Sequence, residues 1–176
     1  MAIPPNTNIP SSSQFMKFND GANKLRIISD FVTGWEGWKD NKPFRHEGQV
    51  CKIQATQVDL NKNNKPNINY FWAAIVYNYK EKRVQVLEIT QKTVMSALQG
   101  FEENSDWGDL KGYDVTVNKS KEGGKTSYTV TPSPAKDMTI EAKQIIDNAE
   151  EMDLQKIFDG KYPVEVEAGD VDVDAF

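Results

Sequence analysis

The stretch NYFWAAIVYNYKEKRVQVLEIT, residues 69–90, decides the fold of this 176-residue chain. Residues 69–79 and 83–90 are rich in β-branched and aromatic side chains, and a short charged turn separates them. This pattern predicts two strands joined as a tight hairpin. Along the second strand, Arg83 and Gln85 alternate with valines, so we expect these two side chains to face solvent.

Both faces of the first predicted strand carry aromatic side chains. In strict alternation Trp72 shares a face with Tyr70, whereas Tyr77 and Tyr79 share the other face. One set is expected in the core. The alternation leaves open which set that is.

The segments on either side of this hairpin also have regular patterns. Alternation predicts strands at 24–33 and around 50–58, and a second hairpin from 112–118 and 125–131 across a glycine-rich turn. Helical spacing predicts a helix at 92–101 with Thr90 or Thr93 as its cap, a second helix at 139–149, and a shorter helical piece at 153–158 that begins at Asp153. The polar, glycine- and proline-punctuated residues 34–69 read as a long insertion.

Strand, long insertion, hairpin, helix and hairpin is the element order of the five-stranded OB-fold barrel. We therefore expect a mainly β protein with flanking helices: an OB barrel with a long insertion between strands one and two, a C-terminal helix outside the sheet and a disordered acidic tail. The expected divisions are a flexible leader at 1–14, the OB core at 15–136, a C-terminal helical segment at 137–160 and the tail at 161–176.

Charge is divided unevenly along the chain, whose net charge is −5. Residues 1–136 hold 18 Lys and Arg against 14 Asp and Glu, whereas residues 137–176 hold 3 against 12. A mildly basic body joined to an acidic arm is compatible with a polyanionic ligand. The arm ends in Phe176, so it either presents an aromatic ring and carboxylates to a partner or serves only as a solubilising end.

Few residues are suited to metal or covalent chemistry. The single Cys51 and single His46 exclude an internal disulfide and a closed Cys/His zinc site, and we expect no metal, no cofactor and no enzymatic activity. The carboxylates between Glu102 and Asp109 lack the spacing of a calcium loop and read as a solvated acidic loop. No signal peptide or membrane-spanning run is recognisable, so a soluble cytoplasmic protein without a membrane partner is expected.

Aromatic and basic residues interleave in the run WEGWKDNKPFR, residues 35–45, which we expect to be a loop. Either its tryptophans plug the end of a barrel, or they stack on nucleobases while nearby cations neutralise phosphates. The candidate contacts for single-stranded DNA are Trp35, Trp38, Lys39, Lys42, Phe44, Arg45, Tyr70, Trp72, Tyr77, Tyr79, Lys82, Arg83, Lys119 and Lys121. The lysines of the second hairpin are also an ordinary way of keeping a turn solvated.

Three parts of the chain resemble the phage and bacterial single-stranded DNA-binding proteins that join an OB barrel to an acidic, phenylalanine-terminated tail. They are the terminal GDVDVDAF, the GWEGW run at 34–38, and the run from Tyr70 to Thr90. The resemblance implies a barrel that coats single-stranded DNA in replication, recombination or repair, in the host cytoplasm if the protein is phage-encoded. It also implies that the tail recruits polymerase, helicase or recombination proteins.

In that reading Asp170, Asp172, Asp174 and Phe176 form the partner-binding end of the tail. Homo-oligomers are compatible with this arrangement. Some phage members hold zinc through cysteines and a histidine, and the one Cys and one His of this chain cannot form that site. The alternative function is a non-catalytic protein-interaction or DNA-mimic module, in which the aromatic run docks on another protein.

Overall fold

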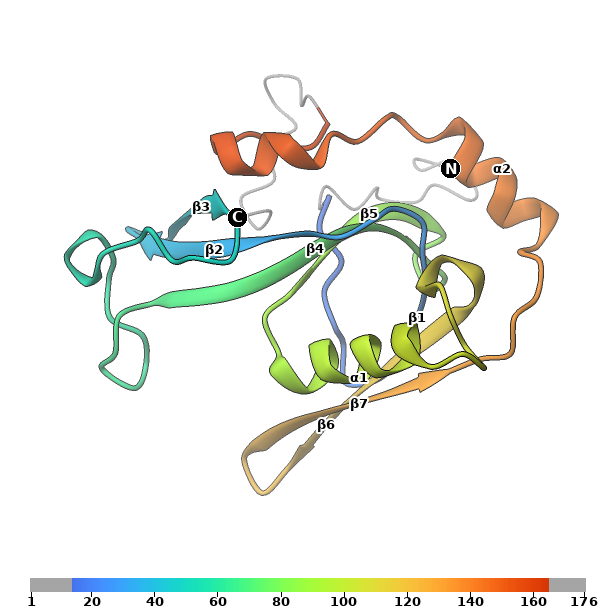
Figure 1. Cartoon of the computed structure of the whole chain (residues 1–176), viewed down its shortest axis with the longest axis horizontal. Helices are drawn as coiled ribbons and strands as arrows, with labels where there is room; N and C mark the ends of the chain where they lie inside the picture. Colours follow the sequence, from blue (N-terminus) through green and yellow to red (C-terminus); the bar gives the residue numbers. More distant parts are fainter. Residues whose placement is uncertain (1–13, 165–176) are drawn as a thin grey trace, which may run out of the picture.

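The computed structural model describes residues 14–164. Seven strands form one antiparallel sheet, with α1 on one side and α2 and η3 on the other (Figure 1). We call the side of α1 the inner face and the side of α2 and η3 the outer face. The strands are β1 (Gly21–Ile27), β2 (Val32–Lys39), β3 (Lys42–Glu47), β4 (Ile68–Asn78), β5 (Arg83–Ile89), β6 (Asp114–Glu122) and β7 (Lys125–Pro132). The helices are η1 (Ala55–Gln57), α1 (Lys92–Glu103), η2 (Leu110–Gly112), α2 (Ile140–Asn148) and η3 (Leu154–Asp159).

The prediction of a mainly β protein with flanking helices is confirmed, although the sheet has seven strands instead of five. The strand order is β3-β2-β4-β1-β6-β7, and β5 pairs with the second edge of β4. Within residues 14–164 no ladder joins β5 to β7. None of the helices in this range is long and apolar enough to cross a membrane.

The expected single strand at 24–33 is wrong, because the chain is kinked between β1 and β2. Both strands nevertheless pair with the same edge of β4, with Leu25 opposite Asn78 and Thr33 opposite Trp72. At the kink the Ser29 Oγ accepts a hydrogen bond from the Ile75 backbone N–H at 2.8 Å. The side chain thus replaces a ladder bond, and β1 and β2 act as one bent strand.

The prediction that residues 35–45 form a loop is also wrong, since they lie in the β2–β3 hairpin. Gly34 and Gly37 look like loop residues, but each allows a close approach. A Cβ on Gly34 would meet the His46 backbone carbonyl, and a Cβ on Gly37 would lie 2.7 Å from a Val58 methyl group. The strand expected around 50–58 is likewise absent there: that segment holds only η1.

The two other hairpins, β4–β5 and β6–β7, and helices α1 and α2 confirm the predictions. Thr139 caps α2 by accepting a hydrogen bond from the Ala142 N–H. Neither Thr90 nor Thr93 caps α1: its N-cap is Gln91, which makes no side-chain capping bond. Asp153 caps η3 as expected.

Strand β4 is buried on both faces, which answers the question that its alternation left open. On the inner face Ala74 and Val76 join the main core, which also includes side chains of α1 and β6. On the outer face Phe71 and Ala73 pack with Ile157 of η3. Gln85 was expected at the surface, but it is 1% exposed. Its amide oxygen accepts a hydrogen bond from the buried Asn78.

Candidate nucleic-acid interface

Six ring-bearing side chains lie together on the inner face of the sheet. Cross-strand pairing places five of them, because directly opposed residues of an antiparallel ladder share a face, and the ring contact with Trp72 places Phe31. Trp35 is opposite both Tyr70 of β4 and His46 of β3, and Trp72 is two residues beyond Tyr70. We call the set the aromatic strip: Phe31, Trp35, Phe44, His46, Tyr70 and Trp72.

The rings of the strip contact one another in pairs. The ring centroids of Trp35 and Tyr70 are 5.2 Å apart, and those of Phe31 and Trp72 are 5.7 Å apart. Phe44 and His46 meet edge to face at 6.1 Å. His46 is exposed and the other five residues are half-buried, so the strip keeps π-surface available to solvent.

Two contacts hold the strip in place. The Trp35 indole N–H donates to the backbone carbonyl of Gln49 at 3.0 Å, which fixes the ring. Tyr70 and Trp72 pack against the main core. Rings that are held rigid and partly exposed are suited to stacking on planar groups such as nucleobases.

Two lysines flank one end of the strip at the tip of the β2–β3 hairpin. Lys39 and Lys42 are opposite each other across a turn in which Asp40 and Asn41 both have positive φ, of 52° and 61°. The Lys39 ammonium lies 3.1 Å from the carboxylate of Asp59, and this hydrogen bond raises the pKa of Lys39. Both lysines are exposed, so this end of the strip offers two cations, one of which, Lys39, is paired with Asp59.

The β6–β7 hairpin carries further cations. Lys121 is exposed, whereas Lys119 is half-buried and its ammonium donates to the Phe18 carbonyl at 3.3 Å.

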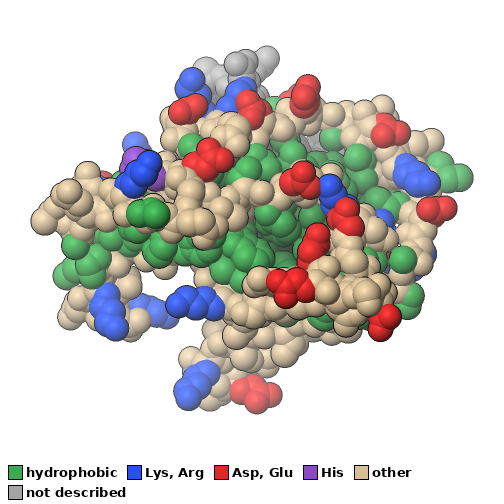
Figure 2. Space-filling model, viewed as in Figure 1, with side chains coloured by type: hydrophobic (Ala, Val, Ile, Leu, Met, Phe, Trp, Pro, Cys, Tyr) green, Lys and Arg blue, Asp and Glu red, His purple; other side chains and the backbone are tan. Residues whose placement is uncertain are grey.

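In the space-filling view, hydrophobic side chains line a hollow below β2, Lys and Arg gather at its lower left, and Asp and Glu gather on its right (Figure 2). The inner face thus combines aromatic surface with a gradient of charge.

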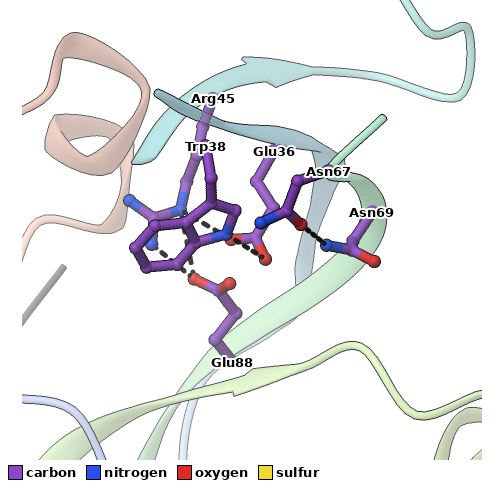
Figure 3. A network of polar contacts seen from close by, with 6 residues as sticks. All are labelled: Glu36, Trp38, Arg45, Asn67, Asn69 and Glu88. Atoms are coloured by element: carbon purple, nitrogen blue, oxygen red, sulfur yellow. Dashed lines mark hydrogen bonds and ion pairs between the residues drawn. The ribbon is translucent and has the colours of Figure 1, made fainter. Parts of the chain in front are cut away.

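Trp38 and Arg45, both predicted contacts, belong instead to the outer face of the sheet. The guanidinium of Arg45 donates to a Glu88 carboxylate oxygen from Nε at 3.1 Å and from a terminal nitrogen at 2.7 Å. Trp38 lies over this pair and donates from its indole N–H to Glu36 at 3.4 Å (Figure 3). Arg45 is only 5% exposed, so its charge is used inside the protein.

Glu36 completes this network and holds a proton at neutral pH. Burial, and then the neighbouring Glu88 carboxylate, raise the pKa of Glu36 to about 9. Arg45, with its Nε 3.7 Å from Glu36, opposes this shift but does not cancel it. A protonated Glu36 leaves one carboxylate, Glu88, to balance one guanidinium in a buried site.

Four other candidate residues lie away from the strip. Tyr77 is 3% exposed and packs under α2, and burial raises its pKa. The Tyr79 hydroxyl donates to the buried Asp114 carboxylate at 2.7 Å. Lys82 forms an ion pair with Glu141 of α2 at 3.2 Å, and Arg83 begins β5 near the same turn.

The structure therefore brings together Trp35, Phe44, Tyr70 and Trp72, with Lys39 and Lys42 at the end of the hairpin. Sequence analysis missed Phe31 and His46 as members of the strip. His46 follows Phe44 at the strand period of two, which is the signal that would have identified it once β3 was recognised. The tail residues Asp170, Asp172, Asp174 and Phe176 lie outside the described residues.

Comparison with known proteins gives one similarity and no family assignment. No protein-family model matches the chain. A curated protein of Escherichia phage T5, named "Probable ssDNA-binding protein", is 21% identical over 145 residues. The match covers 66% of this chain and 54% of that protein. The chain is thus distantly similar to about half of a phage protein with that name.

Proposed function

We propose that this protein binds single-stranded DNA along the aromatic strip, without enzymatic activity. The observation that carries the proposal is the strip itself: five rings on one face of β2, β3 and β4 and that of Phe31 just before β2, with exposed Lys39 and Lys42 at the end of the hairpin. Each unpaired base offers a π-face to such rings, and stacking is worth roughly 1–3 kcal/mol per base. The name of the phage T5 relative supports the same ligand.

The binding is tolerant of sequence over most of the strip, because every base can stack and lysines contact only phosphates. Lys121 and Lys125 of the β6–β7 hairpin extend the positive surface. Paired bases in a duplex do not expose their faces, so the strip discriminates against double-stranded DNA. Arg45 and Tyr77 are left out of the contact set because both are buried under other elements.

The sheet is further proposed to be a variant of the OB barrel. Its insertion is the β2–β3 hairpin together with the segment that follows this hairpin as far as Pro66. In support, α1 falls between β5 and β6, and β1 pairs with both β4 and β6. We also propose that the protein coats and protects single-stranded DNA in phage replication, recombination or repair. In this proposal the end of the chain recruits replication proteins.

Fluorescence titration tests the binding. The wild-type chain is titrated with oligo-dT and with duplex DNA, and Trp35→Ala is compared with Trp107→Ala. Trp107 packs with Phe101 and Tyr113, outside the strip. We expect oligo-dT alone to bind, Trp35→Ala to weaken it about 5- to 150-fold, and Trp107→Ala to leave the affinity within about twofold. Equal affinities for the two variants, or no binding of oligo-dT, would contradict the proposal.

A second comparison tests the role of the chain end. The full chain and a chain ending at Val164 are compared for their affinity for oligo-dT and for binding to replication proteins in a pull-down. Removal of the carboxylates after Val164 is expected to strengthen DNA binding and to abolish the protein contacts. If the chain ending at Val164 still bound replication proteins, the recruiting role would be contradicted, while the proposal that the aromatic strip binds DNA would stand.

A further inference from the structure

We propose that a cavity at the end of the aromatic strip is a selective pocket for one unstacked base that carries an exocyclic amino group. Cytosine, adenine and guanine carry that group and thymine does not. The inference rests on the proposed single-stranded DNA binding and adds base selectivity to it.

The cavity continues the aromatic strip. It has a volume of about 300 Å³ and lies between the kink that joins β1 to β2 and the C-terminal end of α1. Phe31 and Trp72 line it, and both are members of the strip. Ile27 and Leu110 add apolar wall from β1 and η2. This volume is at the lower limit of small-ligand pockets, which fits a single base better than an extended ligand.

The charge around the cavity admits a base and repels a phosphate. Asp30, Glu102, Glu103 and Asp109 all line it, against the single cation Lys111. The Lys111 ammonium is already held by the Asp30 carboxylate at 2.6 Å. Phosphates within a Debye length of this rim, about 8–10 Å, are disfavoured. The DNA backbone therefore passes on the lysine side of the strip, and only an uncharged base enters.

The same carboxylates select among bases. An ionised carboxylate only accepts hydrogen bonds, and an exocyclic amino group donates them. Thymine instead presents carbonyl oxygens on both sides of its single ring N–H, and these oxygens face the carboxylates unfavourably. Glu102 is well placed for this role, because the Leu110 backbone N–H donates to one of its oxygens at 2.9 Å and holds the carboxylate beside the cavity.

An acid-rimmed apolar cavity also suits a lysine-containing peptide. The continuity of Phe31 and Trp72 with the DNA-stacking rings favours the base. Binding of a peptide in the cavity would not require the adjoining rings of the strip. A cavity that binds a peptide instead of a base would leave the affinities for oligo-dC and oligo-dT equal.

The test compares oligo-dC with oligo-dT of equal length, both titrated into the full chain. We expect wild-type protein to bind oligo-dC about 3- to 10-fold more tightly, as the net contribution of one added hydrogen bond would give. Glu102→Gln keeps an oxygen for the Leu110 N–H but loses the ionised acceptor, so the dC/dT ratio is expected to fall to about one. The control is Glu150→Gln, the same charge change at an exposed position just after α2, which should leave the ratio unchanged.

A second variant separates selectivity from affinity. Phe31→Leu removes one wall of the cavity and should lower the dC/dT ratio, whereas Trp35→Ala should weaken both oligonucleotides equally. A wild-type ratio of one, or a ratio that Glu102→Gln leaves unchanged, overturns the pocket while DNA binding stands. Failure of both oligonucleotides to bind overturns the pocket and the proposed function together.

Discussion

Glu36 shows, at the scale of one residue, how burial sets a charge state. In the folded chain its pKa is about 9, against an ordinary value of 4.5. Between these two values the folded protein binds one proton more than the unfolded protein. The free energy of unfolding contributed by Glu36 is therefore fully present below about pH 4.5 and is lost as the pH rises towards 9.

Glu36→Gln is expected to remove this pH dependence. The neutral amide mimics the protonated acid, so the variant should gain stability relative to wild type as the pH rises from 5 to 9. Urea unfolding at pH 5, 7 and 9 measures the difference, with Glu150→Gln as an exposed control. Parallel stability profiles for wild type and Glu36→Gln would show that Glu36 is ionised in the fold.

The close packing around Gly37 gives a second prediction at the scale of one residue. A methyl group there would lie 2.7 Å from Val58 and 2.8 Å from the Phe44 ring, so Gly37→Ala should destabilise the fold by about 1–3 kcal/mol. Gly100 lies inside α1 with nothing within 4 Å of an added Cβ. Gly100→Ala should therefore stabilise the protein by about 0.5–1 kcal/mol. Thermal or urea unfolding distinguishes the two signs, and unchanged stability of Gly37→Ala would argue against the close packing at Gly37.

At the scale of elements, the β6–β7 hairpin tests where the DNA backbone runs. Replacing Lys121 and Lys125 by Gln removes two phosphate contacts in the proposed complex. The slope of log affinity against log salt should then become shallower by about 1.4, since each contact to a single strand contributes about 0.7. Lys143→Gln with Lys161→Gln, an equal charge change at exposed positions in and after α2, is the control. Equal slopes for the two double variants would place the DNA away from this hairpin.

The sequence predicts an element well when local patterns determine it, and poorly when contacts with distant segments do. The β4–β5 and β6–β7 hairpins and both α-helices follow from local alternation or helical spacing, so they were predictable. The β2–β3 hairpin was not, because Gly34 and Gly37 signal a loop locally while their role is to let Phe158 and Val58 pack closely. Local patterns carry no information on such approaches between distant segments.

The candidate site was predicted in composition but not in arrangement. Trp35 and Trp38 stand three residues apart, and only the observed strand shows that they point to opposite faces. Arg45 was expected to be a phosphate contact because it is a cation near aromatic residues. Its burial with Glu88 depends on β5, which lies more than 35 residues away in the sequence.

At the scale of the whole molecule, the C-terminal segment is part of the fold, because it covers apolar surface of the sheet. Leu154 and Ile157 are buried against Phe71 and Val86 on the outer face. A chain ending at residue 137 loses this cover. Burial of each of the two aliphatic side chains contributes about 1.5–3 kcal/mol, so the truncation should cost at least about 3 kcal/mol. A chain ending at Val164 is the control and should unfold like the full chain.

Unfolding curves and dye binding to exposed apolar surface measure this loss. If the chain ending at residue 137 unfolded cooperatively with unchanged stability, the C-terminal segment would be only an attached arm.

The two ends of the described chain meet on the covered side of the molecule. The Gln14 side-chain amide donates to the Val164 carbonyl at 3.1 Å, and the Val164 N–H donates to the Gln14 amide oxygen at 3.0 Å. A short peptide bridge from one to the other would close the backbone into a ring without disturbing the sheet, and new ends opened at the β6–β7 turn would give a circular permutant. Fluorescent labels attached at Gln14 or Val164 would likewise sit behind the sheet, away from the aromatic strip.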